Sequence, residues 1–350
     1  MADGAAARPR GAFIELTLAR LRELIREPEA VFWVFVFPIL LAAILGLAFR
    51  SRPPEALPVA VVAGPHAGAR LAALSAQTDL APRLLGEAEA RQQLARGRVV
   101  LVVSAEEPPL YAYDPTQPES RAARLAVDAA LQRAAGRSDA FTPGQALVTE
   151  PGARYVDFLV PGLLGMNIMG TGMWGIGFSL VVARQGNLLK RLVASPARRS
   201  HILGAQVLSR LIFLVPEAGV LLLFAWLALG VPVRGSLLLL VAVSLLGALA
   251  FCGLGLLAAA RPRTIEGASG IMNLIMVPMW IFSGIFFSTE RFPAAMQPFV
   301  RALPLTALND ALRGVMLDGT GLAPLLPKLA LLAAWGVISF AVALKAFRWQ

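Results

Sequence analysis

Long apolar runs alternate with short polar segments along most of the chain. A helix that crosses a membrane needs about 20 predominantly apolar residues, because each residue advances about 1.5 Å through a hydrocarbon core roughly 30 Å thick. Four runs reach about this length without a charged residue: Ala30–Phe49, Phe158–Ala183, Gly235–Ala260 and Gly267–Thr289. Two further runs are Leu211–Val233, which contains Glu217, and the shorter Leu329–Leu344, which is flanked by lysines.

These runs predict an α-helical membrane protein with six transmembrane helices. The predicted spans are residues 30–49, 155–183, 203–229, 236–260, 267–289 and 327–346. Residues 290–326, between the last two spans, are predicted to form an external helical segment. A cleavable signal peptide is the alternative for the first run, but its length, its internal proline and the lack of an Ala-x-Ala site beyond it favour a retained helix.

The longest stretch between predicted spans, residues 50–154, has the composition of a folded domain. Pro58–Ala63 and Arg98–Val103 are predicted as short buried strands. Three helices are predicted between and after them: Arg70–Gln77, Glu87–Arg96 and Glu119–Ala135. Strands that alternate with helices indicate a small α/β domain.

The N-terminal segment, residues 1–29, contains a candidate amphipathic helix at Phe13–Arg26, with Pro28 just beyond it. Its apolar side chains fall near one face, and its arginines fall largely elsewhere; the apolar set is Phe13, Leu16, Leu21, Leu24 and Ile25. The pattern predicts a helix that lies at the cytoplasmic membrane surface. A solvated helix packed on another chain is the alternative.

The placement of basic residues predicts the orientation in the membrane. The chain has 32 Lys and Arg against 22 Asp and Glu, a net charge of +10. Basic residues gather in the N-terminal segment, in the loop 184–202, after the fourth predicted span and at the C-terminus. Both termini and the loop 184–202 are therefore predicted to be cytoplasmic, which puts the domain 50–154 outside.

Composition and motifs argue against an enzyme. The chain is 57% hydrophobic and 15% charged, whereas soluble domains carry about 25% charged residues. Each of the three lysines lies outside a phosphate-binding G-x-x-x-x-G-K-[ST] loop. The single cysteine, Cys252, and the two histidines, His66 and His201, have no metal-ligand spacing. We therefore expect no catalytic residue, metal or cofactor held directly by this chain.

Four segments carry the most informative motifs. ARQGNLLKRLVASPARRSHILGAQ, at Ala183–Gln206, has a basic LKRL stretch followed by Ser-Pro. LRELIREPEAVFWVFVFPILLA, at Leu21–Ala42, joins the amphipathic helix to a span with an internal proline. Met279–Gly319 joins a Ser-Gly pair to PLT and ALRGVMLDG, and Leu110–Leu131 lies in the external domain. Taken in their order along the chain, the four segments resemble ABC-2 type transporter permeases, in the branch with a large extracytoplasmic domain between the first two spans.

The resemblance implies a permease subunit that exports a hydrophobic or amphipathic substrate, such as a drug, lipid or glycan, through a homo- or heterodimer. Separate ABC ATPase subunits would bind ATP and Mg²⁺. The chain would lie among the lipids of the bacterial inner membrane, without a nucleic-acid partner. The alternative is a membrane sensor or channel whose external domain binds a ligand without an ATPase.

The resemblance also implies that the loop 184–202 and the amphipathic helix couple the chain to its ATPase. Candidate contacts are Gln185, Asn187, Lys190, Arg191, Arg198 and Arg199. The alternative is that these basic residues only set the topology. Family members commonly carry acidic residues ahead of the LKRL stretch, whereas this chain has Ala183, Gln185 and Asn187 there.

Glu217 is the ionisable residue that lies well inside a predicted span. Intramembrane carboxylates are costly and usually face a cavity or a partner. We expect Glu217, with Asn167 and Asn273 as further polar candidates, to lie on the transport path or at the dimer interface. Alternatively, Glu217 pairs with Arg210, two helical turns away on the same face, or makes a structural hydrogen bond beside Pro216.

Overall fold

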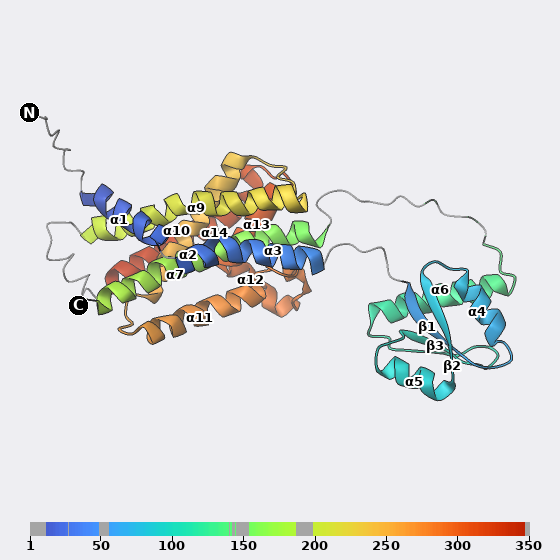
Figure 1. The fold of residues 1–350 in the computed structure, drawn as a ribbon. Helices are drawn as coiled ribbons and strands as arrows, with labels where there is room; N and C mark the ends of the chain where they lie inside the picture. Colours follow the sequence, from blue (N-terminus) through green and yellow to red (C-terminus); the bar gives the residue numbers. More distant parts are fainter. Residues whose placement is uncertain are drawn as a thin grey trace, which may run out of the picture. The chain divides into compact units, whose positions relative to one another are not determined.

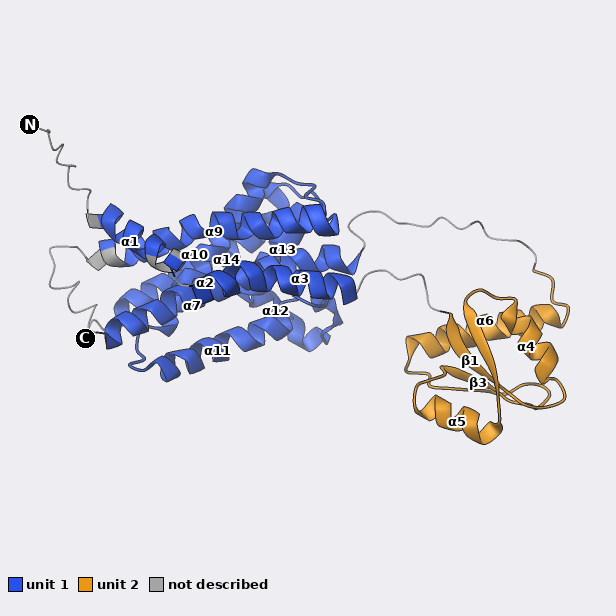
Figure 2. Ribbon diagram, in the orientation of Figure 1, with its two compact units in different colours: residues 1–50, 149–350 blue, residues 51–148 orange. Residues whose placement is uncertain are grey.

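The computed structural model describes residues 12–26, 28–48, 56–139, 154–186 and 199–346, together with Phe141 and Gly144. The chain forms two compact units, which Figure 2 shows in different colours: residues 1–50 with 149–350, and residues 51–148. Each unit has hydrophobic core residues of its own.

The larger unit is a bundle of long apolar helices that run side by side (Figure 1). Among the described residues, five helices are long and apolar enough to cross a membrane. They are α7 (Tyr155–Gln185), α9 (Arg199–Leu229), α10 (Leu237–Ala258), α11 (Ile265–Phe282) and α14 (Leu322–Ala346). The larger unit therefore has the architecture of a helical membrane protein.

The first predicted span is a shorter apolar helix, Phe32–Ala48. It follows α1 (Ala12–Arg26) and the short α2 (Pro28–Val31). Its first turn is a π-helix, η1 (Phe32–Val36), which continues into α3 (Phe37–Ala48). The helix therefore falls below the length that the other five reach.

Two helices, α7 and α10, form the centre of the bundle. Each is 56% buried over its most apolar stretch, whereas α9, α11 and α14 are buried over 28%, 22% and 17%. Glycines in α7 allow close packing: a Cβ at Gly165 would lie 1.9 Å from Asn309 Oδ1, and one at Gly172 would lie 2.9 Å from Phe251 Cβ. These two glycines therefore pack against other helices of the same chain.

Helix bounds differ from the predicted spans in three places. Helix α11 ends at Phe282 rather than at 289, because the chain turns at Gly284, whose φ is +69°. Helix α14 begins at Leu322, ahead of the predicted start at 327, and Pro327 lies inside it. The predicted loop 184–202 is helical at both ends, because α7 continues to Gln185 and α9 begins at Arg199.

The predicted segment 290–326 contains two short 3₁₀ turns and two helices before α14 begins: η2 (Thr289–Arg291), η3 (Ala294–Met296), α12 (Gln297–Ala302) and α13 (Pro304–Met316). Most of α13 is buried. Asn309 donates a hydrogen bond to the carbonyl of Ser283 (2.9 Å), and the Arg313 guanidinium lies 3.7 Å from the centre of the Phe158 ring. These contacts fix α13 against α7 and the turn after α11.

The smaller unit is the α/β domain that the sequence predicts. Its four strands lie in the order β2-β1-β3-β4, with β1 parallel to β2 and β3, and β4 antiparallel to β3. The strands are β1 (Leu57–Val62), β2 (Leu80–Leu85), β3 (Leu101–Val103) and β4 (Tyr111–Tyr113). Strands β1 and β3 correspond to the two predicted strands, whereas β2 and β4 were not predicted.

Helices cover both faces of this sheet (Figure 1). Side chains of β1 and β3 alternate between them: Val59 and Val61 pack towards α4 (Ala67–Ser75) and α6 (Pro118–Ala134), and Ala60 packs towards α5 (Glu87–Ala95). All three helices overlap the predicted helices.

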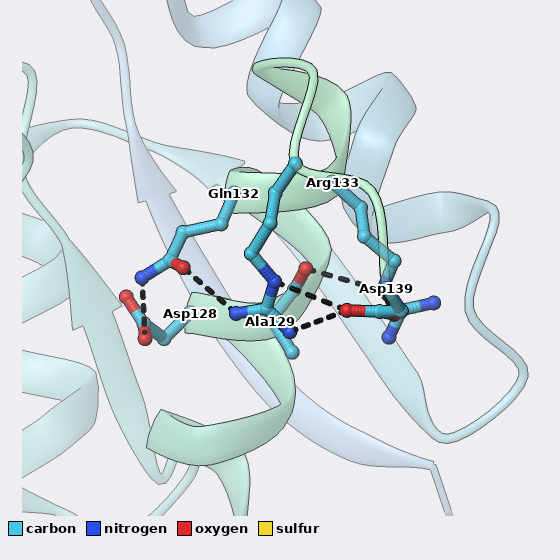
Figure 3. A network of polar contacts seen from close by, with 6 residues as sticks. Asp128, Ala129, Gln132, Arg133 and Asp139 are labelled. Atoms are coloured by element: carbon cyan, nitrogen blue, oxygen red, sulfur yellow. Dashed lines mark hydrogen bonds and ion pairs between the residues drawn. The ribbon is translucent and has the colours of Figure 1, made fainter. Parts of the chain in front are cut away.

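A polar network holds the end of α6 (Figure 3). Gln132 donates to Asp128 (2.9 Å) and accepts from Arg137 (2.8 Å), while Arg137 and Arg133 both reach Asp139. Beside this network, the Tyr111 hydroxyl of β4 donates to Asp128 (3.2 Å), and burial and the nearby Asp128 carboxylate raise the pKa of Tyr111. These groups stabilise the surface of the smaller unit.

Candidate functional site

Three polar side chains and the backbone carbonyl of Asn167 lie together inside the larger unit, and we call Asn167, Thr171, Arg210 and Glu217 the polar cluster. Arg210 and Glu217, both on α9, form an ion pair with side chains only 5% and 0% exposed. The Thr171 hydroxyl of α7 lies 3.1 Å from Glu217 Oε1 and 2.7 Å from the carbonyl oxygen of Asn167. The cluster thus joins α7 to α9.

The π-helical turn η1 lies against the same cluster. A π-helix shifts the backbone hydrogen bonds by one residue, and here the Phe37 N–H donates to the carbonyl of Phe32. Asn167 Nδ2 donates to the Val34 carbonyl at 3.3 Å. Phe35 packs edge to face on Phe213 of α9, at 5.4 Å between ring centres. Three helical segments therefore meet at the polar cluster.

The depth of the cluster makes its pairing important. Glu217 lies near the middle of the membrane-length part of α9, Leu203–Leu229, and Thr171 lies near the middle of α7. A charge at such a depth is costly unless it is paired, and the loss of one partner leaves the other uncompensated. The geometry shows Glu217 paired with Arg210, which is the structural alternative raised from the sequence.

The cluster combines an ion pair within α9 with a hydrogen bond between α7 and α9. It joins one carboxylate to a guanidinium and a hydroxyl. Over the described parts of the chain, no three His, Cys, Asp or Glu residues are grouped in a way that could hold a metal ion. The hydrogen bond from Thr171 to Glu217 is therefore the contact of the cluster that a movement of α7 relative to α9 would break.

The candidate coupling residues are only partly described. Gln185, the last residue of α7, is exposed, and its Nε2 lies 3.4 Å from the carbonyl oxygen of Arg263. Arg199 begins α9. The remaining candidates lie outside the described residues: Asn187, Lys190, Arg191 and Arg198.

Arg184, which precedes Gln185, makes a contact that the sequence analysis missed. Its Nη1 donates to the carbonyls of Ala259 (3.1 Å) and Pro262 (2.5 Å), in the turn between α10 and α11. A single arginine at the end of an apolar run is typical of a topology signal, so this link could not be predicted from the sequence. The end of α7 is thereby tied to the turn that starts α11.

The amphipathic helix α1 packs on α9 of the same chain. The Phe13 ring lies edge to face on His201 at 5.9 Å, and it lies 3.2 Å from where a Cβ of Gly204 would be. Leu16 and Leu21 are half-buried. Leu24 and Ile25 belong to α1, but their side chains lie outside the described part.

The remaining polar candidates lie in different surroundings. Asn167 is buried in the polar cluster, whereas Asn273 is exposed on α11. The sequence analysis raised Arg210 as a partner of Glu217 but missed Thr171. A lone threonine in a glycine-rich run gives no signal, because only the packing of α7 on α9 brings it to the carboxylate.

Together, the bundle of membrane-length helices and the buried ion pair define a polytopic helical membrane protein with an inserted α/β unit. A family model described as "ABC-2 family transporter protein" matches residues 29–345. The chain therefore belongs to this family of ABC transporter permeases.

Several curated proteins are similar to part of the chain. "ABC transporter G family member 20" of Dictyostelium discoideum is 30% identical over 49% of this chain and 24% of its own length. "Linearmycin resistance permease protein LnrN" of Bacillus subtilis is 28% identical over 50% of this chain and 46% of its own length. "Probable multidrug ABC transporter permease YbhS" of Escherichia coli is 28% identical over 54% of this chain and 52% of its own length. The matched part thus spans about a quarter to a half of each relative.

Proposed function

We propose that the chain is the membrane subunit of an ATP-driven exporter whose ATPase subunits are separate chains. The single observation that carries this proposal is the family match over residues 29–345, which includes the helical bundle and the loop 184–202. In this role, the chain forms the transport pathway and the ATPase subunits bind ATP and Mg²⁺. The sequence lacks a phosphate-binding loop with its lysine, in agreement with this division of labour.

The proposed assembly contains two permease subunits, alike or different, and lies in the bacterial inner membrane. Both termini and the loop after α7 face the cytoplasm, where the basic residues of that loop contact the ATPase. The α/β unit, residues 51–148, faces outward. The concentration of arginine and lysine in the predicted cytoplasmic segments supports this orientation.

The proposed substrate is hydrophobic or amphipathic. Two relatives carry names that refer to linearmycin resistance and to multidrug transport, and such a substrate suits a pathway between apolar helices. The hydrogen bond from Thr171 of α7 to Glu217 of α9 would link these two helices during transport. Its opening would let these helices change their packing when the motor closes.

ATP hydrolysis tests this division of labour. The chain would be purified in detergent alone, with the ABC ATPase encoded beside it, and with that ATPase after its Walker A lysine is replaced by alanine. We expect hydrolysis only in the sample with the intact ATPase. Hydrolysis by the chain alone, after contaminating motors have been excluded, would contradict the proposal.

A further inference from the structure

An apolar groove lies between the first turns of α9 and the last turns of α14. It has a volume of about 360 Å³ and is open to the surface of the bundle. Six of its lining residues carry aliphatic or aromatic side chains: Leu203, Val207, Leu208, Leu211, Phe340 and Leu344. The seventh, Gly204, has no side chain, so the wall of the groove is apolar throughout.

The position of the groove matches one half of a bilayer. Its wall on α9 runs from Leu203 to Leu211, a distance of roughly 12 Å at about 1.5 Å per residue. One leaflet contributes half of a hydrocarbon core roughly 30 Å thick. The groove therefore covers most of the depth of one leaflet, starting at the end of the bundle where α14 ends and α9 begins.

A lysine lies at the polar end of this groove. Lys345 is exposed and directly follows the lining residue Leu344. In the sequence, the parts of α9 and α14 at this end, residues 199–211 and 336–346, contain no Asp or Glu. The same two segments contain Arg199, Arg210 and Lys345, of which Arg210 is paired with Glu217. At this end, the two helices that line the groove therefore present positive charge and no carboxylate to a negatively charged group.

We propose that this groove binds one acyl chain of an anionic phospholipid, whose phosphate lies at Lys345. The apolar wall recognises the chain, and the cationic end selects the headgroup, as basic pockets between membrane helices do. This site rests only on the placement of α9 and α14 in a membrane. It does not depend on the ATPase or on the transported substrate.

Native mass spectrometry of the full chain tests the site. The protein would be released from mixed micelles that contain equal amounts of phosphatidylglycerol and phosphatidylcholine, and the retained lipids would be counted. We expect phosphatidylglycerol to be retained preferentially. One lysine near an anionic headgroup contributes about 1 kcal/mol, so Lys345→Gln should lower this preference roughly fivefold.

Two further variants separate the site from general effects. Lys328→Gln is the matched control, because Lys328 lies at the other end of the same helix and pairs with Asp310 at 3.6 Å. It should leave the preference unchanged. Leu208→Trp fills the groove and should lower retention of both lipids. Size-exclusion chromatography would check that this variant folds, and Lys345→Gln tests the site independently of it.

Three results would overturn the proposal. They are equal retention of the two lipids by the unaltered chain, an unchanged preference in Lys345→Gln, and an equal loss of preference in Lys345→Gln and Lys328→Gln. A cysteine at Leu208 that cross-links to a second copy of the chain in lipid would also overturn it, because the groove would then be a protein interface. A failure of the ATPase experiment would leave the lipid site standing.

Discussion

The buried ion pair of the polar cluster gives the sharpest prediction for the larger unit. Glu217→Leu leaves the Arg210 guanidinium without its carboxylate at a position where that side chain is only 5% exposed. Arg210→Met leaves the carboxylate without its guanidinium. The double variant Arg210→Met/Glu217→Leu removes both charges and fills their space with apolar atoms.

The three variants should differ in a characteristic way. Removing one partner of a buried ion pair costs about 3–5 kcal/mol, whereas replacing both by apolar residues is neutral or stabilises by about 1–4 kcal/mol. Each single variant should therefore lower Tm by on the order of 10 °C, and the double variant should recover most of that loss. Thr171→Val removes only a hydroxyl and should cost about 0.6 kcal/mol.

Thermal unfolding in detergent, followed by intrinsic fluorescence, measures these differences. Glu290→Gln is the control, because Glu290 is an exposed carboxylate of the same unit and its loss should change stability by no more than about 0.5 kcal/mol. Additive losses in the double variant would refute the pairing. A Glu217→Leu variant with the same Tm as the Glu290→Gln control would also refute it.

Three further predictions address packing, topology and coupling. Gly165→Ala should lower Tm in the same assay, because its Cβ would lie 1.9 Å from a side-chain oxygen of α13; an unchanged Tm would contradict this packing. In a chain without Cys252, a cysteine at Glu119 should react with an impermeant maleimide in intact cells, and one at Arg263 only after permeabilisation. The reverse pattern would invert the orientation. Lys190→Glu/Arg191→Glu should lower transport roughly 5–150-fold without loss of membrane insertion, since coupling free energies are typically about 1–3 kcal/mol. Transport at the unaltered rate would show that these residues set topology alone.

Apolar composition predicts where membrane-length helices occur, but it predicts their ends poorly. The apolar run continues past Phe282 through Ile285 and Phe287, so the apolar pattern does not show that the chain turns at Gly284, where φ is positive. Helix α14 continues through Pro327, although a proline in the sequence predicts a helix boundary.

In the smaller unit, too, the sequence pattern predicts only some of the elements. Strand β2 escaped prediction because it contains Pro82, and a proline argues against a central strand. The strand lies at the edge of the sheet, where a proline is tolerated. Strand β4, Tyr111–Tyr113, is too short to show an alternating pattern.

The polar cluster was predictable only within one helix. The spacing of Arg210 and Glu217 places them on one face of α9, so their pairing could be raised from the sequence. The contacts with Thr171 and the π-helical turn depend on how separate helices pack. No local pattern encodes that packing.

Co-purification tests the central claim most directly. The chain, carrying an affinity tag, would be extracted in mild detergent from cells that also express the ABC ATPase encoded beside it. A Lys190→Glu/Arg191→Glu chain would serve as the matched comparison. The account predicts that the ATPase elutes with the unaltered chain in a fixed ratio and is depleted with the variant. Elution of the chain without any ATPase, in a form that still gates ions or responds to a ligand of the α/β unit, would contradict the account and favour a sensor or channel.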